Sequence, residues 1–457
     1  MIHVLRIGIV PLFLFLCLIL GGASAAGYWS NMALQLIAIP IIAWSILIRR
    51  STPMSSSSRT LMWLLALMLL LIGVQLIPLP PAIWTALPGR DGVAAGFAML
   101  GLPLPWLPIS LAADATLASA LWLLPAIAVL LGIVRLGGFK PSWLAWAIAI
   151  ITLLSVALGA LQIVGGEGSR WYFYKITNYG VTTGFFSNAN HMATLLVSTV
   201  PFLAALYLTA RRRGRSLQRM SGLVVILAGA LTVVFVGLAA NRSLAGLGLA
   251  IPVLAASLLM ILSRKRALPR WSVALVALLT IGSIAIAFSA PFANNLTSAE
   301  AQVSDESRYT SFTRTLEASK DYMPVGSGIG SFQAIYRTHE DPAEVTRFYM
   351  NHAHSDLIEL ILETGVPGLL LILLFLYWWS RRTISIWNAE EPDYFARAAT
   401  IASAAIIAHS LVDYPLRTAG ISAVFAMCCA LMAEPRARAQ RRQAEPTAAK
   451  ARHLSAD

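Results

Sequence analysis

Twelve long apolar runs dominate this sequence. A helix needs roughly 20 apolar residues to cross about 30 Å of hydrocarbon, and the chain is 58% hydrophobic and only 12% charged. Soluble domains carry about 25% charged residues. The sequence therefore predicts an all-α polytopic membrane protein with about twelve transmembrane helices. The candidate spans are residues 4–23, 31–48, 60–78, 115–135, 142–164, 190–210, 221–240, 244–263, 271–290, 357–379, 397–413 and 418–433.

The distribution of lysine and arginine predicts how these spans are oriented. Short cytoplasmic segments carry an excess of Lys and Arg, and a cytoplasmic N-terminus places 24 of the 34 basic residues on that side. Both termini are then cytoplasmic. An alternative is that the first run is a signal peptide, with Arg6 before it and "ASA" at 23–25. The net charge of +13 follows from this topology and does not indicate nucleic-acid binding.

Three segments on the opposite, outer side are longer than a turn. Residues 79–114 are rich in Pro and Trp, and residues 165–189 in aromatics and Gly. Residues 291–355, between the ninth and tenth spans, form the largest loop and contain an amphipathic helical pattern. Within it, "PVGSGIGSF" at 324–332 lacks the strand and helix of a nucleotide site, so it predicts a flexible turn over an outward cavity.

The sequence divides into a bundle and a tail. Residues 1–433 are predicted to form the transmembrane bundle. Residues 434–457 are polar, basic and without apolar periodicity, which is typical of disorder.

Titratable residues gather where the tenth apolar run begins. His352, His354 and Asp356 lie within five residues, and Glu359 and Glu363 follow at helical spacing. Carboxylates inside a span are costly and indicate a functional or paired role. Because histidine exchanges protons near neutral pH, both histidines are candidate general bases. Histidines bonded to loop backbone are one alternative, and a metal site with H-x-H-x-D spacing, a weak signal, is another.

Other polar residues are predicted to lie at the same membrane level. Arg242 occupies a very short turn between two spans, where either a lipid diphosphate or a span carboxylate would match its guanidinium. Asn188 and Asn190 begin the sixth span and would either bind sugar hydroxyls or cap the helix. "AHSLVDYPLRTAG" adds Asp413 and Arg417 in the turn between the last two spans.

These segments resemble the O-antigen ligase and Wzy-type polysaccharide polymerase family. The resemblance covers about 184–417 and rests on "GFFSNAN", on Arg242, on "SRYTSFTRTLEASKDYMPVGSGIGSF" and on "NHAHSDLIELILETGVPGLLL". His354 matches the histidine of the family's "AHN/AHS" motif, whereas His352 is an additional one. Ser355 replaces the commoner asparagine, so an amide contact at that position does not carry over.

The resemblance implies a GT-C-like, metal-independent, inverting glycosyltransferase of the bacterial inner membrane, with its active site in the periplasm. It would transfer a glycan from undecaprenyl diphosphate to an acceptor glycan or lipid A core, without a cofactor. An O-antigen ligase is expected, with a polymerase as the alternative and a precursor transporter as a more distant one. His354 would be the base and Arg242 would bind the diphosphate, helped by arginines such as Arg170. The expected substrate-binding residues are Asn188, Asn190, Arg308, Arg314, His352, Asp356, Glu359, Asp413 and Arg417.

Overall fold

The computed structural model describes most of the chain as helix. The described residues are 2–24, 28–49, 53–137, 139–214, 216–263, 270–287, 299–340, 342 and 350–434, which leaves the predicted tail from residue 435 and parts of the 291–355 loop outside them. The membrane-type helices are α1 (Ile2–Leu20), α2 (Trp29–Leu47), α3 (Ser56–Gln75), α6 (Ala113–Trp122), α7 (Leu124–Leu136), α8 (Pro141–Val164), α9 (Ala189–Arg212), α10 (Leu217–Asn241), α11 (Leu244–Leu262), α12 (Arg270–Ala287), α16 (Asp356–Trp387), α17 (Tyr394–His409) and α18 (Ala419–Ala433).

Each predicted apolar run falls on one of these helices, with one interruption. The run at 115–135 is split at Leu123 into α6 and α7, and Pro125 occupies the first turn of α7, where a missing backbone N–H is tolerated. Among the described residues, eight helical segments are long and apolar enough to cross a membrane. The chain is thus an all-α polytopic membrane protein, and the count of twelve spans stays a prediction.

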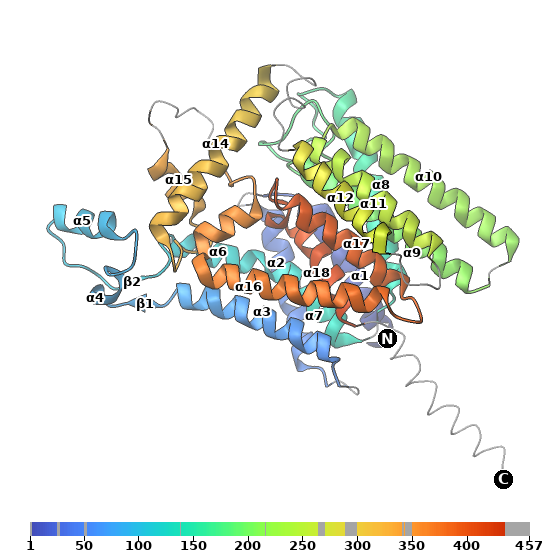
Figure 1. The fold of residues 1–457 in the computed structure, drawn as a ribbon, viewed down its shortest axis with the longest axis horizontal. Coiled ribbons are helices and arrows are strands. Elements are labelled where there is room, and N and C mark those ends of the chain that lie inside the picture. The colour runs from blue at the N-terminus through green and yellow to red at the C-terminus, as the bar shows by residue number, and fades with distance from the viewer. Residues whose placement is uncertain are drawn as a thin grey trace, which may run out of the picture.

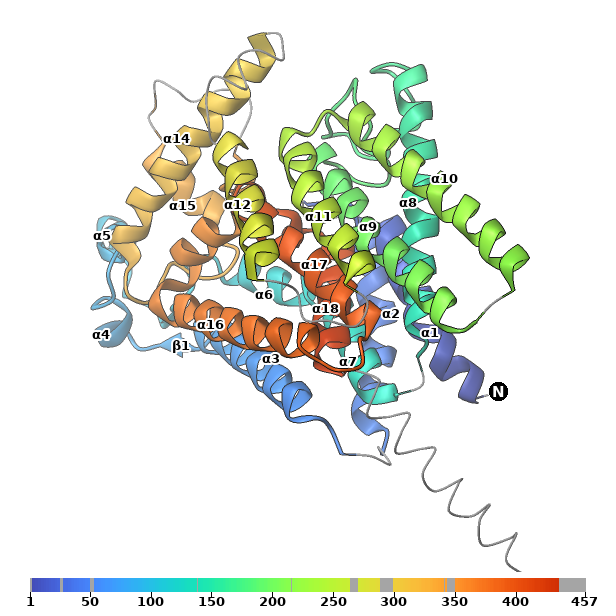
Figure 2. The same ribbon diagram turned by 45° about the vertical axis from the view of Figure 1, so that its right-hand side comes forward.

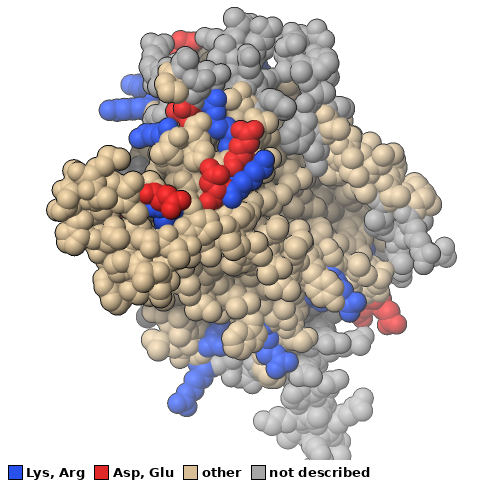
Figure 3. Space-filling model, turned by 60° about the vertical axis from the view of Figure 1, so that its left-hand side comes forward, with Lys and Arg blue, Asp and Glu red and all other residues tan. Residues whose placement is uncertain are grey.

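The helices form a bundle around α9. In the most hydrophobic 18-residue stretch of α9, 89% of the residues are buried inside the protein. The neighbours of α9 are α8, α10, α11 and α17. Small hydroxyl residues let α8 and α9 approach closely, and Thr152 and Thr199 share a hydrogen bond of 2.8 Å between them. Figures 1 and 2 show α16 lying alongside α3, with α17 and α18 behind it. On the face in Figure 3, charged side chains gather toward two ends, and uncharged surface lies between them.

Short elements form a cap at one end of the bundle. Residues 79–114 contain the helices α4 (Pro81–Trp84) and α5 (Asp91–Met99), flanked by two paired strands, β1 (Pro78–Leu79) and β2 (Leu107–Pro108). The periodic pattern of the large loop is helical as predicted, in α14 (Ala299–Tyr322), and a second helix, α15 (Phe332–His339), follows it in the same loop. In Figures 1 and 2, these elements lie together beside the start of α16. Separately, a short 3-10 helix, η1 (Pro415–Arg417), joins α17 to α18.

The glycine-rich turn at 324–332 is a packed structural element, which differs from the flexible turn predicted for it. Helix α16 is broken at Gly365, where φ is 58°, and Pro367 has no N–H to offer the carbonyl of Glu363. The turn supplies the missing partners. Gly328 N donates to Glu363 O at 2.9 Å, Ser327 N donates to Leu362 O at 3.0 Å, and Val366 N donates back to Pro324 O at 2.8 Å.

The glycines of this turn are required by close approach as well as by backbone conformation. Gly328 has a φ of 107°, and a Cβ there would collide with Ser110 of the cap. Arg90 of the cap is buried and donates to the carbonyl of Gly326 at 3.1 Å. The turn therefore joins the cap to the break in α16, directly behind the titratable residues.

Candidate functional site

Three carboxylates of α16 are buried on one face of the helix. Asp356, Glu359 and Glu363 are 3%, 1% and 0% exposed, and their spacing of three and four residues aligns them along the axis. Arg417 of η1 faces all three. Its Nε lies 3.6 Å from Asp356 Oδ1, and its Nη2 lies 3.4 Å from Glu359 Oε1 and 3.0 Å from Glu363 Oε2. One guanidinium thus holds the charged face of a membrane helix.

Hydrogen bonds add further partners to two of these carboxylates, Glu363 and Asp356. Glu363 Oε1 accepts from Gly330 N at 2.8 Å, which ties it to the glycine-rich turn. Asp356 Oδ2 accepts from Ser410 Oγ at 2.8 Å and from Leu416 N at 3.2 Å. Buried charges persist in proteins when they are both paired and hydrogen-bonded. Helices α16 and α17 and the turn before α18 are therefore joined at one polar centre.

His352 is a second cation of this centre. Its Nδ1 lies 2.9 Å from Glu359 Oε1, and its Nε2 lies 3.1 Å from the carbonyl oxygen of Ser24. Both partners are acceptors, so both ring nitrogens must donate, and only the imidazolium can donate twice. Burial by itself would lower the pKa of His352, but the charge and hydrogen bond of Glu359 outweigh it and raise the pKa above its ordinary value.

The His352–Glu359 pair gives stability a definite pH dependence. Because the pKa of His352 is raised on folding, its stabilising contribution is complete below about pH 6.5, the ordinary histidine value. It is lost as pH rises through the raised folded-state pKa. We expect the melting temperature of the parent to exceed that of His352→Gln at pH 6, and the difference to shrink by pH 9. A constant or growing difference, measured by differential scanning fluorimetry in lipid nanodiscs, would contradict the paired imidazolium.

Tyr414 lies against three histidines, two from the segment just before α16 and one from α9. The centroids of the His352, His354 and His191 rings lie 4.5, 5.3 and 5.1 Å from that of Tyr414. His354 has a φ of 54°, a left-handed backbone that is uncommon for residues other than glycine and recurs at active sites. The next residue, Ser355, caps α16 by accepting from Ile358 N. The cap and the strained residue fix where the His354 ring stands relative to the carboxylate face.

Arg242 ends α10 in a turn that neighbouring residues anchor. Its own φ is 59°, and its side chain is exposed. On one side, Asn241 is buried and donates to the carbonyls of Thr182 and Ala189 at 2.6 and 2.9 Å. On the other, Ser243 caps α11 and donates to Asn190 Oδ1 at 2.7 Å.

The sequence left two alternative partners for Arg242, a lipid diphosphate and a carboxylate within a span. With the described residues Arg242 forms no hydrogen bond or ion pair. Glu359, one of its candidate span partners, is instead engaged by Arg417 and His352. Among the residues that the structure describes, Arg242 is thus an exposed cation without a counter-charge, in a turn anchored by Asn241 and Ser243.

The other candidate residues are placed in several ways. Asn188 caps α9 by accepting from Asn190 N at 2.8 Å. Asp413 accepts from Tyr414 N through Oδ1 at 2.9 Å, and its carbonyl accepts from Asp356 N at 3.2 Å. Arg314 stacks over the Tyr336 ring at 5.9 Å within the cap. The side chain of Arg308 lies outside what the structure describes.

The structure also identifies participants that the sequence did not single out. Tyr414 and the Ser24 carbonyl both enter the cluster, and Gln75 of α3 donates to the carbonyl of Glu363 at 2.9 Å. The adjacency of Tyr414 to Asp413 was the one local signal. In the described part of the chain, no group of three or more His, Cys, Asp or Glu side chains is placed to hold a metal ion.

Comparison with known proteins places this site in a family context. No curated protein matches the chain. One family model does, over residues 229–373, less than half of the chain. The matched segment contains Arg242, the glycine-rich turn, His354 and the carboxylate face of α16, and it ends before Tyr414 and Arg417. That model is described as O-antigen ligase, and the match confirms the resemblance of this chain to the O-antigen ligase and Wzy-type family.

Proposed function

We propose that the protein is a periplasm-facing glycosyltransferase of the bacterial inner membrane. It would move a glycan from an undecaprenyl-diphosphate donor to a sugar of lipid A core, as an O-antigen ligase. The family match supports this class of function. The observation that carries the proposal is the pair His352 and His354 at the charged end of α16, which lies within the matched segment. The periplasmic orientation rests on the distribution of Lys and Arg in the sequence.

His354 is the general base in this proposal. A base must have a nitrogen lone pair, and His352 has none while both of its nitrogens donate to oxygen acceptors. His354 would take the proton of the acceptor hydroxyl as that oxygen forms a bond to the anomeric carbon of the donor sugar. The bond from that carbon to the diphosphate oxygen breaks, and the diphosphate leaves with the electron pair. Attack opposite the leaving group inverts the anomeric configuration.

Arg242 is proposed to bind the diphosphate, because its guanidinium matches a phosphate and has no protein partner among the described residues. Arg417, which the sequence grouped with the substrate ligands, is assigned a positioning role, since three carboxylates already occupy it. The energy of transfer would come from the lipid diphosphate itself. No metal or cofactor is required by this scheme.

The role of Arg242 can be tested with two substitutions, one that removes its charge and one that keeps the charge but changes the shape of the charged group. We expect Arg242→Ala to lower donor affinity or transfer rate about ten- to a hundredfold, since a charge-assisted hydrogen bond contributes roughly 1.5–3 kcal/mol. Arg242→Lys keeps the charge but loses the two-pronged geometry, so it should retain part of the activity. Arg219 is exposed at the opposite end of α10 from Arg242, so Arg219→Ala supplies a control on the same helix. Parental kinetics in purified Arg242→Ala would exclude a diphosphate contact.

A Wzy-type polymerase is the alternative within the same chemistry, because it differs in acceptor and not in donor. A transporter of a polysaccharide precursor is less well supported. Transporters place charged groups at mid-membrane between broken helices. Helix α16 is also broken, at Gly365, but its carboxylates begin at its first residue, beside the large loop.

Surface glycan analysis of a deletion strain separates these functions. A ligase predicts loss of all polymer from lipid A core, and a polymerase predicts single repeat units on the core. Restoration by the parental gene, but not by a His354→Ala copy, would tie the phenotype to transfer. Unaltered surface glycans in the deletion strain would refute both enzymes.

A further inference from the structure

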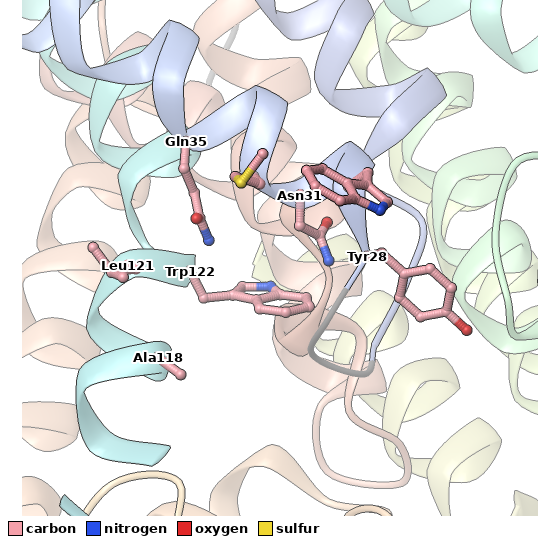
Figure 4. Close-up of a pocket in the computed structure, with 8 residues that line it drawn as sticks. Tyr28, Asn31, Gln35, Ala118, Leu121 and Trp122 are labelled. Atoms are coloured by element: carbon pink, nitrogen blue, oxygen red, sulfur yellow. The ribbon is translucent and has the colours of Figure 1, made fainter. Parts of the chain in front are cut away.

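A pocket of about 310 Å³ opens between α2 and α6, apart from the residues assigned to transfer. None of its lining side chains carries a formal charge. Figure 4 shows the amides of Asn31 and Gln35 directed toward the space beside the Trp122 indole. The lining residues are Tyr28, Trp29, Asn31, Met32, Gln35, Ala118, Leu121 and Trp122.

Asn31 is the unusual member of this pocket. Its side chain is only 5% exposed, yet neither Nδ2 nor Oδ1 has a hydrogen-bond partner in the described part of the chain. The indole Nε1 of Trp122 is also buried and without such a partner. Buried polar groups are nearly always hydrogen-bonded, and an unpaired one is especially costly at membrane depth. The pocket thus offers a donor and an acceptor from one amide, and a second donor from the indole.

The mouth of the pocket is apolar. Trp29, Met32 and Leu121 are 80%, 43% and 43% exposed on helices that are long and apolar enough to span a bilayer. A ligand would therefore enter from the lipid. The pocket volume is near the lower end of the usual range for small-molecule sites, about 300–1,000 Å³. This is room for one ring-sized polar group and excludes a long oligosaccharide.

We infer that this pocket binds a neutral, hydroxyl- or amide-bearing ring of the size of one sugar, carried on a membrane lipid. The lining has no cation to neutralise a phosphate and no carboxylate to pair with an amine. An amide donor and acceptor side by side match neighbouring hydroxyl groups, and an indole offers an apolar surface to the C–H face of a ring. The inference deepens the proposed function, because either a lipid-linked donor or a glycolipid acceptor carries such a ring.

The test measures lipid binding and not glycan transfer. A negative binding result would therefore contradict the pocket inference without contradicting the proposed transfer activity, and a protein inactive in transfer could still bind the lipid. Purified full-length protein in a polyether detergent, which has no sugar headgroup, is titrated with lipids and followed by native mass spectrometry. Glucosyl diacylglycerol is compared with diacylglycerol, and undecaprenyl phosphate glucose with undecaprenyl phosphate. We expect at least one glucosylated lipid to bind about tenfold or more tightly than its sugar-free counterpart. The pair that shows the difference identifies the source of the ring.

The variants assign that preference to the pocket. Asn31→Leu should abolish the preference for the sugar, and Gln35→Leu, at a less buried position, should weaken it even if Asn31→Leu folds poorly. Leu36→Ala provides a control on the same helix, since Leu36 is 59% exposed and does not line the pocket. Equal binding of sugar-bearing and sugar-free lipids, or an undiminished preference in folded Asn31→Leu and in Gln35→Leu, would overturn the inference and leave acyl chains or water as the occupants.

Discussion

His354→Ala is expected to lower glycan transfer by about 10²- to 10⁴-fold, the usual contribution of a positioned general base. The variant should still insert and accumulate normally, because His354 lies outside the ion network of Asp356, Glu359 and Arg417. The measurement is transfer of glycan from undecaprenyl diphosphate by purified protein in nanodiscs, alongside the melting temperature. Loss of activity at an unchanged melting temperature is the predicted result.

His339→Ala is the matched control for that experiment. His339 belongs to the cap, where its Nε2 lies 3.0 Å from Asp321 Oδ2, and it is not part of the Tyr414 cluster. It should retain transfer. Parental activity in His354→Ala would remove the base assignment, and activity that depended on added divalent metal would favour the metal-site alternative.

Arg417→Met should be the most destabilising substitution at the site. It removes the one guanidinium that faces three buried carboxylates, and breaking a buried ion pair from one side costs about 3–5 kcal/mol. Burial by itself would lower the pKa of Arg417, but Glu359, Glu363 and Asp356 together raise it above its ordinary value, so the guanidinium is charged at any working pH. We expect a lower melting temperature together with loss of transfer. Arg417→Lys, with a compact charge, should be intermediate.

A double variant distinguishes positioning from ligand binding. Glu363→Gln removes one uncompensated charge, so Arg417→Met with Glu363→Gln should be more stable than Arg417→Met alone. Arg170→Met is the control, since exposed substitutions usually change stability by less than about 0.5 kcal/mol. If Arg417→Met kept the parental melting temperature and lost only donor affinity, Arg417 would be a diphosphate ligand, as the sequence grouped it.

The sequence was most informative where the determining interactions are local. Apolar length located most of the helices within a few residues, because hydrocarbon requires that every backbone group be satisfied within the segment. The exceptions are α16, which continues to Trp387 beyond the predicted end at 379, and the run at 115–135, which is split into α6 and α7. The spacing of Asp356, Glu359 and Glu363 likewise predicted one helical face. Helix capping was predictable too. Of the two alternatives for Asn188, sugar binding or helix capping, the structure shows the cap, at the start of α9.

The sequence was less informative where residues far apart must meet. "PVGSGIGSF" looked flexible because glycine permits many conformations, but these glycines are needed for close packing against the break at Gly365 and Pro367. Nothing local indicated that the carbonyl of Glu363, which Pro367 cannot satisfy, would be served by Gly328 and Gln75. Similarly, the additional histidine, His352, looked like a second base until its two acceptor partners were known.

By itself, the sequence determined a polytopic helical membrane protein with carboxylates and histidines at the start of one helix, because hydrophobic length and helical periodicity act over short stretches of chain. The tertiary structure decided which cation those carboxylates receive. Arg242 and Arg417 are equivalent as sequence features, since each lies in a short turn between apolar runs. Helix packing turns Arg417 toward α16 and leaves Arg242 exposed, because a buried charge is stable only where packing brings its counter-charge within contact.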